Sequence, residues 1–342
     1  MDHNENTGIL LETAYLTAIT IIIVVLGVHI PGVMVFTVFL SAIPLVIITI
    51  RTNERITLLS ILVSYIIIIL LTGQVISATT AVLSCGFAGL AVGYGLKRKW
   101  QFKELLVLAS AAYLLSILAM ILLLNYIEGV NQIEKLIMEP SRQWFAGLEL
   151  RMREMIKAFE GNPLYTNNLE ELKDRLNMVE DYIYVINMLI PSFFIISSAF
   201  LGYVTVTLSK IVLKRFKYDS KYLPRFSELG VSKGMTIVFI VSFVLLLFVD
   251  QMTLKAAIIN VNFILSVILM VGGLAVLDFF VKKAGIPGAV RVIIYLTVFG
   301  ISLILGVILP FLHPANILVL IAMADSMFDF RKLRHGREDG GQ

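Results

Sequence analysis

The sequence alternates between long apolar runs and short polar connectors, and one long polar interval at 128–181 separates two blocks of such runs. A helix needs about 20 apolar residues to cross a bilayer. Ten runs approach that length, with glycine, proline or charged residues between them. They are 11–29, 32–50, 56–72, 76–96, 105–126, 183–208, 234–250, 256–281, 289–309 and a short one at 312–328. The pattern predicts an all-α polytopic membrane protein with about ten transmembrane helices.

The same pattern divides the chain into parts. We expect a first transmembrane block of five spans at 1–126, an extracytoplasmic amphipathic helical hairpin at 127–182, a second block of five spans at 183–330 and a cytoplasmic tail at 331–342. Within the hairpin region, apolar residues from Ile133 to Phe159 recur at helical spacing with charges between them. Such a helix packs its apolar stripe on a partner, or it acts as a lid or a docking surface.

Composition and charge indicate a membrane protein and how its chain is oriented in the membrane. The chain is 58% hydrophobic and 15% charged, whereas about a quarter of the residues in a soluble domain are charged. The net charge is +4, yet the interval at 128–181 holds seven basic and eleven acidic residues. The basic surplus follows every even-numbered run, and basic connectors face the cytoplasm. We therefore expect both termini in the cytoplasm and the polar interval outside. The short tenth run is counted as a span, because with nine spans the basic C-terminal tail would lie outside.

Small residues recur four apart in two of the expected spans. Gly89 and Gly93 lie in the run at 76–96, and Ala14 and Ala18 lie in the first run. Small residues let helix backbones approach closely. Close packing matters in lipid, because the hydrophobic effect does not drive one helix against another there. We interpret these positions as sites of helix packing or partner contact, not as direct contributors to a passage.

A few ionisable residues fall inside the apolar runs, where burial of a charge is costly. These candidates are Glu12, Asp278, Asp325 and Asp329. Each is expected near the inner membrane surface, and Asp278 lies one turn before Lys282, where a pair at i and i+4 can form. We interpret them as structurally paired charges and not as a proton relay.

Uncharged polar residues are the candidates for a substrate site near the middle of the membrane. A carrier needs a pocket with a few convergent polar groups. The candidate substrate-binding residues are Asn187, Asn260, Asn262, Gln74, Thr79 and Thr80. Asn260 and Asn262 are two residues apart, so they point to different faces of one helix and cannot both hold neighbouring helices together.

The chain contains no motif for catalysis or metal binding. No H-E-x-x-H, P-loop or G-x-S-x-G motif occurs. His29, His313 and Asp250 are expected on the outer side, but their spacing is not that of a metal site. The single Cys85 cannot form an intramolecular disulfide. We expect no enzymatic activity, no cofactor, no metal and no nucleic-acid partner.

Several short motifs carry a family resemblance. The stretches at 272–287, 324–332, 12–18 and 93–100, in their order and spacing, resemble the YybS-like family of bacterial predicted membrane proteins. That family is a domain of unknown function, so the resemblance implies a bacterial cytoplasmic (inner) membrane location and not an activity.

The first five spans are also distantly similar to the S components of energy-coupling-factor vitamin transporters. This resemblance implies that Ala14 and Ala18 contact a membrane partner subunit. The chain departs from the S components in its length, its outer hairpin and its second block of spans, so it implies no substrate residues. The same broad fold also resembles cell-shape membrane scaffolds.

We therefore expect a protein that binds or transports a small organic or lipid-like substrate, with the lipid bilayer, that substrate and a membrane protein as its partners. The alternative is a membrane scaffold or assembly factor that recruits proteins. An intramembrane enzyme is a weaker third hypothesis, because no residue pattern supports it.

Overall fold

The computed structural model describes residues 3–30, 32–129, 131–159, 176, 187–216, 218, 224–291, 293–295, 297–298 and 314–331. In these ranges every regular element is a helix. The chain forms two compact units, Met1–Tyr222 and Leu223–Gln342, and each is described by itself. The predicted all-α polytopic architecture is confirmed.

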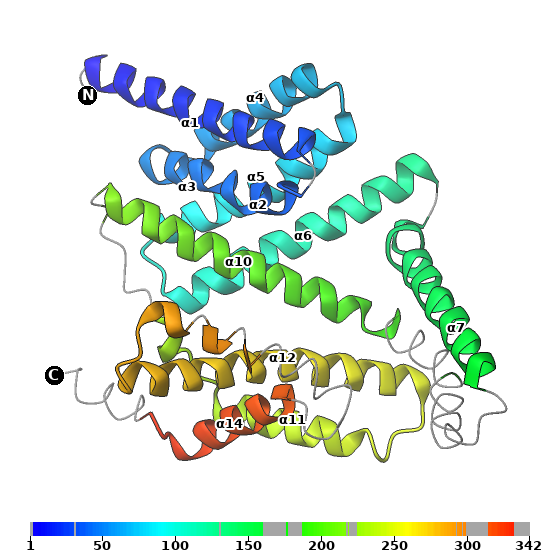
Figure 1. Ribbon diagram of the computed structural model, residues 1–342. Coiled ribbons are helices and arrows are strands. Elements are labelled where there is room, and N and C mark those ends of the chain that lie inside the picture. The colour runs from blue at the N-terminus through cyan, green and yellow to red at the C-terminus, as the bar shows by residue number, and fades with distance from the viewer. Residues whose placement is uncertain are drawn as a thin grey trace. The chain divides into compact units, whose positions relative to one another are not determined.

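The helices of the first unit are shown from blue to green in Figure 1. They are α1 (His3–His29), α2 (Met34–Leu40), α3 (Ala42–Arg51), α4 (Glu54–Thr72), α5 (Val75–Lys97), α6 (Phe102–Glu128), the π-helix η1 (Glu134–Met138), α7 (Glu139–Phe159) and α10 (Ile190–Arg215). The second unit contains the 3-10 helix η3 (Phe226–Glu228), α11 (Lys233–Leu245), α12 (Met252–Lys283) and α14 (Pro314–Phe328).

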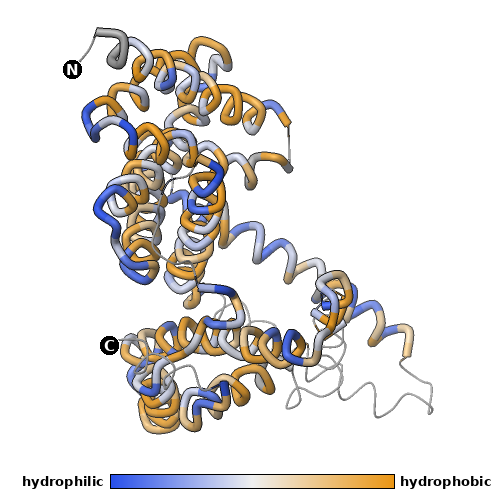
Figure 2. The backbone as a smooth tube through the Cα atoms, turned by 90° about the vertical axis from the view of Figure 1, so that its left-hand side faces the viewer, coloured by the Kyte–Doolittle hydropathy of each residue, from blue (hydrophilic) through white to orange (hydrophobic). Residues whose placement is uncertain are grey.

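Six helices in the described ranges are long and apolar enough to cross a membrane: Thr7–His29, Glu54–Thr72, Val75–Lys97, Phe102–Glu128, Ile190–Arg215 and Met252–Lys283. Three shorter apolar stretches, Phe36–Arg51 (in α2 and α3), Lys233–Leu245 and Ile317–Phe328, coincide with three further predicted runs. The predicted run at 289–309 lies largely outside the described residues. Figure 2 shows hydrophobic residues along most of the helical path.

The short helix α3 is buried along almost its whole length. The predicted run at 32–50 forms two helices, α2 and α3, which are divided at Ser41. The Ser41 hydroxyl donates to the Thr37 carbonyl over 2.6 Å. Every residue from Ala42 to Thr49 is buried. Pro44 sits in the first turn of α3, where its missing N–H leaves no gap in the hydrogen bonding.

Glycines of α5 allow α3 to approach closely. A Cβ added at Gly89 would lie 3.0 Å from the carbonyl oxygen of Ala42, and one added at Gly93 would collide with the side chain of Thr49. Close backbone approach of this kind is how small residues hold helices together in lipid. α5 and α3 therefore form the centre of the first unit.

The grouping of the spans differs from the block boundaries expected from the sequence. The sequence pattern placed the run at 183–208 in the second block, but α10 packs against α6 inside the first unit (Figure 1). Its residue Pro191 lies at the start of the helix and does not interrupt it. Charge and hydropathy mark where a span ends, but they do not say which neighbour it packs on.

The predicted hairpin is described in its first arm. η1 leads directly into α7, in which Phe145 and Ile156 are buried while Trp144 is 66% exposed. α7 is therefore amphipathic, as the sequence pattern predicts. The predicted second arm, after Gly161, lies outside the described residues except for Leu176.

In the second unit, the 32-residue helix α12 packs against η3, α11 and α14. It is about 48 Å long at 1.5 Å per residue. Gly272 and Gly273 allow α14 to approach, because a Cβ on Gly273 would meet the backbone carbonyl of Leu318. The small buried core around this contact includes Leu269, Val319 and Ala322.

Candidate functional site

The first unit contains a cavity of about 270 Å³ between α5, α6, η1 and the start of α10. Most of its wall is aliphatic, with polar side chains concentrated on α5 and α6. The lining residues are Thr80, Ser84, Ser116, Ile117, Met120, Ile121, Leu124, Gln132, Ile133, Ile137 and Phe194. A mostly apolar cavity with a few polar groups is the usual form of a small-molecule site.

The hydroxyl groups of this wall already donate their protons to other groups of the protein. Thr80 donates to the Ile76 carbonyl over 2.8 Å, and its Oγ1 also lies 3.3 Å from the Met120 sulfur. Ser84 donates to the Thr80 carbonyl over 2.8 Å. A hydroxyl has one proton and two lone pairs. The oxygen atoms of these side chains can therefore serve a ligand only as acceptors.

Ser116 and Gln132 are the other two polar residues of the cavity wall. The Ser116 hydroxyl lies 2.8 Å from the Ala112 carbonyl and 3.0 Å from the Leu83 carbonyl of α5. Gln132 is 3% exposed, and one N–H of its Nε2 donates to Glu128 over 2.9 Å, which leaves its amide oxygen as an acceptor and its second N–H as a donor. The three hydroxyl groups of the cavity wall thus form a neutral set of acceptors, beside the amide of Gln132.

The π-helix η1 closes one side of this cavity through Ile137 and the residue just before it, Ile133. π-Helical turns are rare and occur frequently at functional sites. Here the turn directs two aliphatic side chains toward α5 and α6.

A second, smaller cavity of about 30 Å³ lies on another side of α5. Thr80 and Ser84 line both cavities, and Thr37 and Ser41 add further hydroxyls to the smaller one. Its volume is enough for about one or two water molecules. The face of α5 that carries Thr80 and Ser84 is therefore bordered by space on both sides.

Of the six predicted substrate-binding residues, Thr80 lines the cavity. Thr79 instead lies 3.1 Å from the hydroxyl of Tyr65 on α4. Gln74 is exposed before the start of α5, where it accepts a hydrogen bond from Ser77 over 2.7 Å. Asn187 lies just before α10, and its buried Oδ1 has no hydrogen-bond partner in the part of the chain that the structure describes.

The other two belong to the second unit. Asn262 donates to Ser242 over 3.0 Å and thereby joins α12 to α11. Asn260 donates to the Ala256 carbonyl of its own helix over 2.9 Å. The two side chains take different faces of α12, as their spacing predicts.

Sequence reasoning missed Ser84, Ser116 and Gln132. The available signal was the i, i+4 spacing of Thr80 and Ser84, which places two hydroxyls on one face of α5. Nothing in the sequence shows that Ser116 of α6 lies opposite that face. Gln132 follows a predicted span and falls in the interval at 127–182 that is expected to form the extracytoplasmic hairpin.

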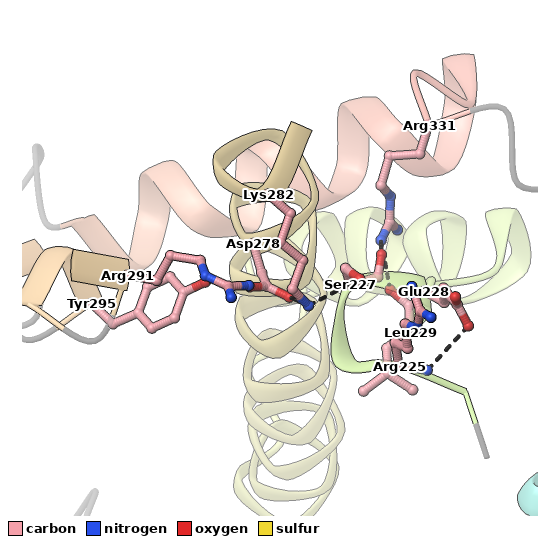
Figure 3. A network of polar contacts seen from close by, with 9 residues as sticks. All are labelled: Arg225, Ser227, Glu228, Leu229, Asp278, Lys282, Arg291, Tyr295 and Arg331. Atoms are coloured by element: carbon pink, nitrogen blue, oxygen red, sulfur yellow. Dashed lines mark hydrogen bonds and ion pairs between the residues drawn. The ribbon is translucent and has the colours of Figure 1, made fainter. Parts of the chain in front are cut away.

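The second unit holds a cluster of charges around Asp278, whose side chain is 6% exposed. Figure 3 shows Arg291 and Tyr295 approaching Asp278 from one side and Ser227 lying on the other. Lys282 and Tyr295 donate to its two carboxylate oxygens. Lys282 also lies 3.3 Å from the Ser227 hydroxyl of η3. Asp278 therefore links α12 to the segment that carries Arg291 and Tyr295, and Lys282 links α12 to η3.

A second buried ion pair fastens the end of α14. Arg331 is 1% and Asp325 is 7% exposed, and the guanidinium donates to Oδ2 of Asp325 over 2.8 and 3.1 Å. The same guanidinium donates to the carbonyls of Ser227 and Leu229 over 2.7 and 3.0 Å. Asp329 follows the helix with a positive φ of 50° and donates its N–H to the Asp325 carbonyl over 2.8 Å.

The remaining predicted positions lie at the surface of the first unit. Glu12 forms an ion pair with Arg51, and the two side chains are 36% and 41% exposed. Ala14 and Ala18 are exposed on α1. Within the described ranges, no three side chains of His, Cys, Asp or Glu gather into a metal-binding group.

Comparison with known proteins identifies the family. The DUF2232 family, described as predicted membrane proteins, matches residues 18–322. The chain belongs to this family. It is also 24% identical over 314 residues to a protein of Bacillus subtilis (strain 168) described as uncharacterized protein YybS, and the match covers 91% of this chain and 92% of that relative. The predicted YybS-like resemblance is thereby confirmed.

No solved structure matches the chain. The predicted similarity to energy-coupling-factor S components stays a prediction. Family membership supports a membrane protein with several apolar helices, which agrees with the structure.

Proposed function

We propose that the first unit binds a small, largely apolar organic molecule that carries an O–H or N–H donor. The observation that supports this most directly is the acceptor-only wall formed by Thr80, Ser84 and Ser116. A ligand with acceptors alone would bury unpaired polar groups, at about 1–3 kcal/mol for each group. A ligand with a donor would satisfy both partners.

The volume and the charge of the cavity narrow the ligand class. A cavity of about 150 Å³ lined by apolar side chains holds benzene. The cavity of about 270 Å³ therefore suits two fused rings or a short alkyl chain. Its lining residues are uncharged, and an unpaired ion would be expelled from such an environment. We propose a neutral ligand.

Binding can be measured on the full-length protein in lipid nanodiscs by equilibrium dialysis of two matched probes. 1-Naphthol has an O–H donor, and 1-methoxynaphthalene has the same rings without one. The wild type is expected to prefer 1-naphthol by about tenfold, the equivalent of one net hydrogen bond. Thr80→Val keeps the side-chain shape but removes one of the three hydroxyl acceptors, so it is expected to reduce this preference.

Two controls separate the cavity from the rest of the helices. Thr79→Val changes the neighbouring hydroxyl, which pairs with Tyr65, and is expected to leave the preference intact. Ile121→Trp fills the cavity and is expected to remove both probes, whereas Leu115→Trp alters a residue of α6 that is 63% exposed. Wild-type binding in Ile121→Trp would contradict the proposal.

We also propose a location in the bacterial cytoplasmic membrane with both termini in the cytoplasm. Support comes from the basic connectors after the even-numbered runs. Single cysteines at Ser220 and Gly161, in a Cys85→Ala background, test this orientation. In intact cells, an impermeant thiol reagent is expected to label Gly161→Cys but not Ser220→Cys. The reverse pattern, or labelling of both, would contradict it.

A scaffold is the second candidate function, and α7 favours it. This helix exposes Trp144 and Leu150, which are 66% and 60% exposed, next to buried Phe145. Aromatic residues of this kind are enriched in the centres of protein interfaces. A scaffold predicts that Trp144→Ser removes a stoichiometric protein partner on purification. Ligand binding predicts that Trp144→Ser leaves the affinity for 1-naphthol unchanged.

A further inference from the structure

The charge cluster around Asp278 has more cations than its one carboxylate can neutralise. Lys282 and Arg291 both pair with this group, at Oδ2 and at Oδ1 respectively. Among the described residues, the elements packed beside the cluster do not supply a second free carboxylate. On η3, Glu228 caps the backbone N–H of Arg225, and on α14 Asp325 is paired with Arg331. The cluster therefore keeps a positive surplus.

The guanidinium of Arg291 has N–H donors that are not used in hydrogen bonds to the described residues. Its Nη1 lies 3.7 Å from Oδ1 of Asp278, which is too long for a hydrogen bond. Its Nε is buried and has no hydrogen-bond partner among the described residues. The side chain is 25% exposed, so the guanidinium is still reachable from outside. A buried guanidinium N–H without an acceptor is unfavourable, so this group fits an additional anionic ligand.

The position of the cluster indicates which anion is available. Lys282 and Lys283 are the last two residues of α12, a 32-residue apolar helix. Basic residues at the end of a span lie at the level of the lipid headgroups. Anionic lipids attract such residues electrostatically. A guanidinium also matches the geometry of a phosphate, because its planar fork can donate two parallel hydrogen bonds.

We propose that Arg291 and Lys282 bind the phosphate group of an anionic membrane phospholipid at this end of α12. Arg291 supplies the planar fork and Lys282 supplies a second charge. Asp278 and Tyr295 position these two side chains. The site lies wholly in the second unit and is independent of the ligand proposed for the first.

The test uses full-length protein in detergent, with short-chain phosphatidylglycerol and phosphatidylcholine as probes and native mass spectrometry as the readout. Both lipids carry a phosphate, but only phosphatidylglycerol has a net negative charge. Wild type is expected to bind phosphatidylglycerol more tightly, and Arg291→Gln is expected to weaken it by about tenfold. Arg291→Lys keeps the charge but loses the fork, so an intermediate loss is expected.

Lys283→Gln is the matched control, because it removes one positive charge at an exposed position at the end of α12, next to Lys282. It is expected to weaken binding by no more than about twofold, as for an exposed charge. Equal losses in Arg291→Gln and Lys283→Gln would overturn the proposal, since they would show attraction without a site. Equal affinity for the two lipids would also overturn it. Displacement of the lipid by millimolar inorganic phosphate would assign the site to free phosphate instead.

Should Arg291→Gln lower the folded yield, Lys282→Gln provides a second variant. Lys282 is 36% exposed, so its loss is less disruptive than that of a fully buried charge. It is expected to reduce phosphatidylglycerol binding by about fivefold, between one strong and one weak charge contact. Unchanged binding in this variant would contradict the assigned role of Lys282.

Discussion

In the unit of Met1–Tyr222 the buried polar side chains are mostly hydroxyls, whereas in the unit of Leu223–Gln342 they include Asp278, Asp325 and Arg331. Lys210, near the end of α10, is the buried charge of the first unit among the described residues. The hydroxyls of Thr49 and Ser84, for example, donate to carbonyls of their own helices. The charges of the second unit reach across several elements.

The difference follows from the energies of the groups. A hydroxyl can satisfy its proton on the preceding helical turn, so it can sit deep in a span and still offer a lone pair to a ligand. A charge needs an opposite charge and several hydrogen bonds, and these come from other elements. The first arrangement therefore suits recognition of a neutral molecule, and the second suits connection of helices and binding of an anion.

The largest expected effect is the loss of a buried charge in the second unit. Arg331→Ala removes the partner of Asp325 and the donor to two carbonyls, so it is expected to lower the free energy of unfolding by about 3–5 kcal/mol. Thermal unfolding in detergent measures this. Arg153→Ala breaks an exposed pair with Glu149 on α7 and is expected to change stability by about 0–1 kcal/mol. Similar losses in both variants would contradict the comparison.

An intermediate effect is expected where helices pack through glycine. Gly273→Ala places a Cβ against the Leu318 backbone, which cannot move aside like a side chain, and should lower stability by about 1–3 kcal/mol. Gly147→Ala in α7 is the control, because nothing lies within 4 Å of its added Cβ. That substitution is expected to stabilise α7 by about 0.5–1 kcal/mol through helix propensity. Unfolding curves of equal midpoint for the two variants would refute this packing.

The smallest effect is expected for a hydroxyl contact of the first unit. The Tyr113 hydroxyl lies 2.7 Å from that of Thr205 and joins α6 to α10. Hydrogen bonds between helices in membranes contribute about 0.6 kcal/mol on average, so Tyr113→Phe should change stability by about that amount. A loss as large as that of Arg331→Ala would show that neutral contacts hold this unit as strongly as charges hold the other.

Local features of this structure could be predicted and distant ones could not. The Asp278–Lys282 pair follows from i, i+4 spacing, and the helix ends follow from glycine, proline and charge. Arg291 and Tyr295 contact Asp278 from the segment that follows α12, and no periodicity in the sequence predicts this contact. The packing of α10 on α6 is equally tertiary. For the same reason, the sequence does not distinguish Thr79 from Thr80 as a candidate. In the structure, Thr79 contacts Tyr65 of α4 and Thr80 contacts Met120 of α6.

The most direct test of the cavity in the first unit is native mass spectrometry of the full-length protein taken from its own membrane in mild detergent. The wild type is expected to carry a neutral organic molecule that is lost in Ile121→Trp and retained in Leu115→Trp and Arg291→Gln. This result would place the molecule in the cavity between α5, α6, η1 and α10. Retention of the same mass in Ile121→Trp, or its loss in Leu115→Trp, would contradict the account.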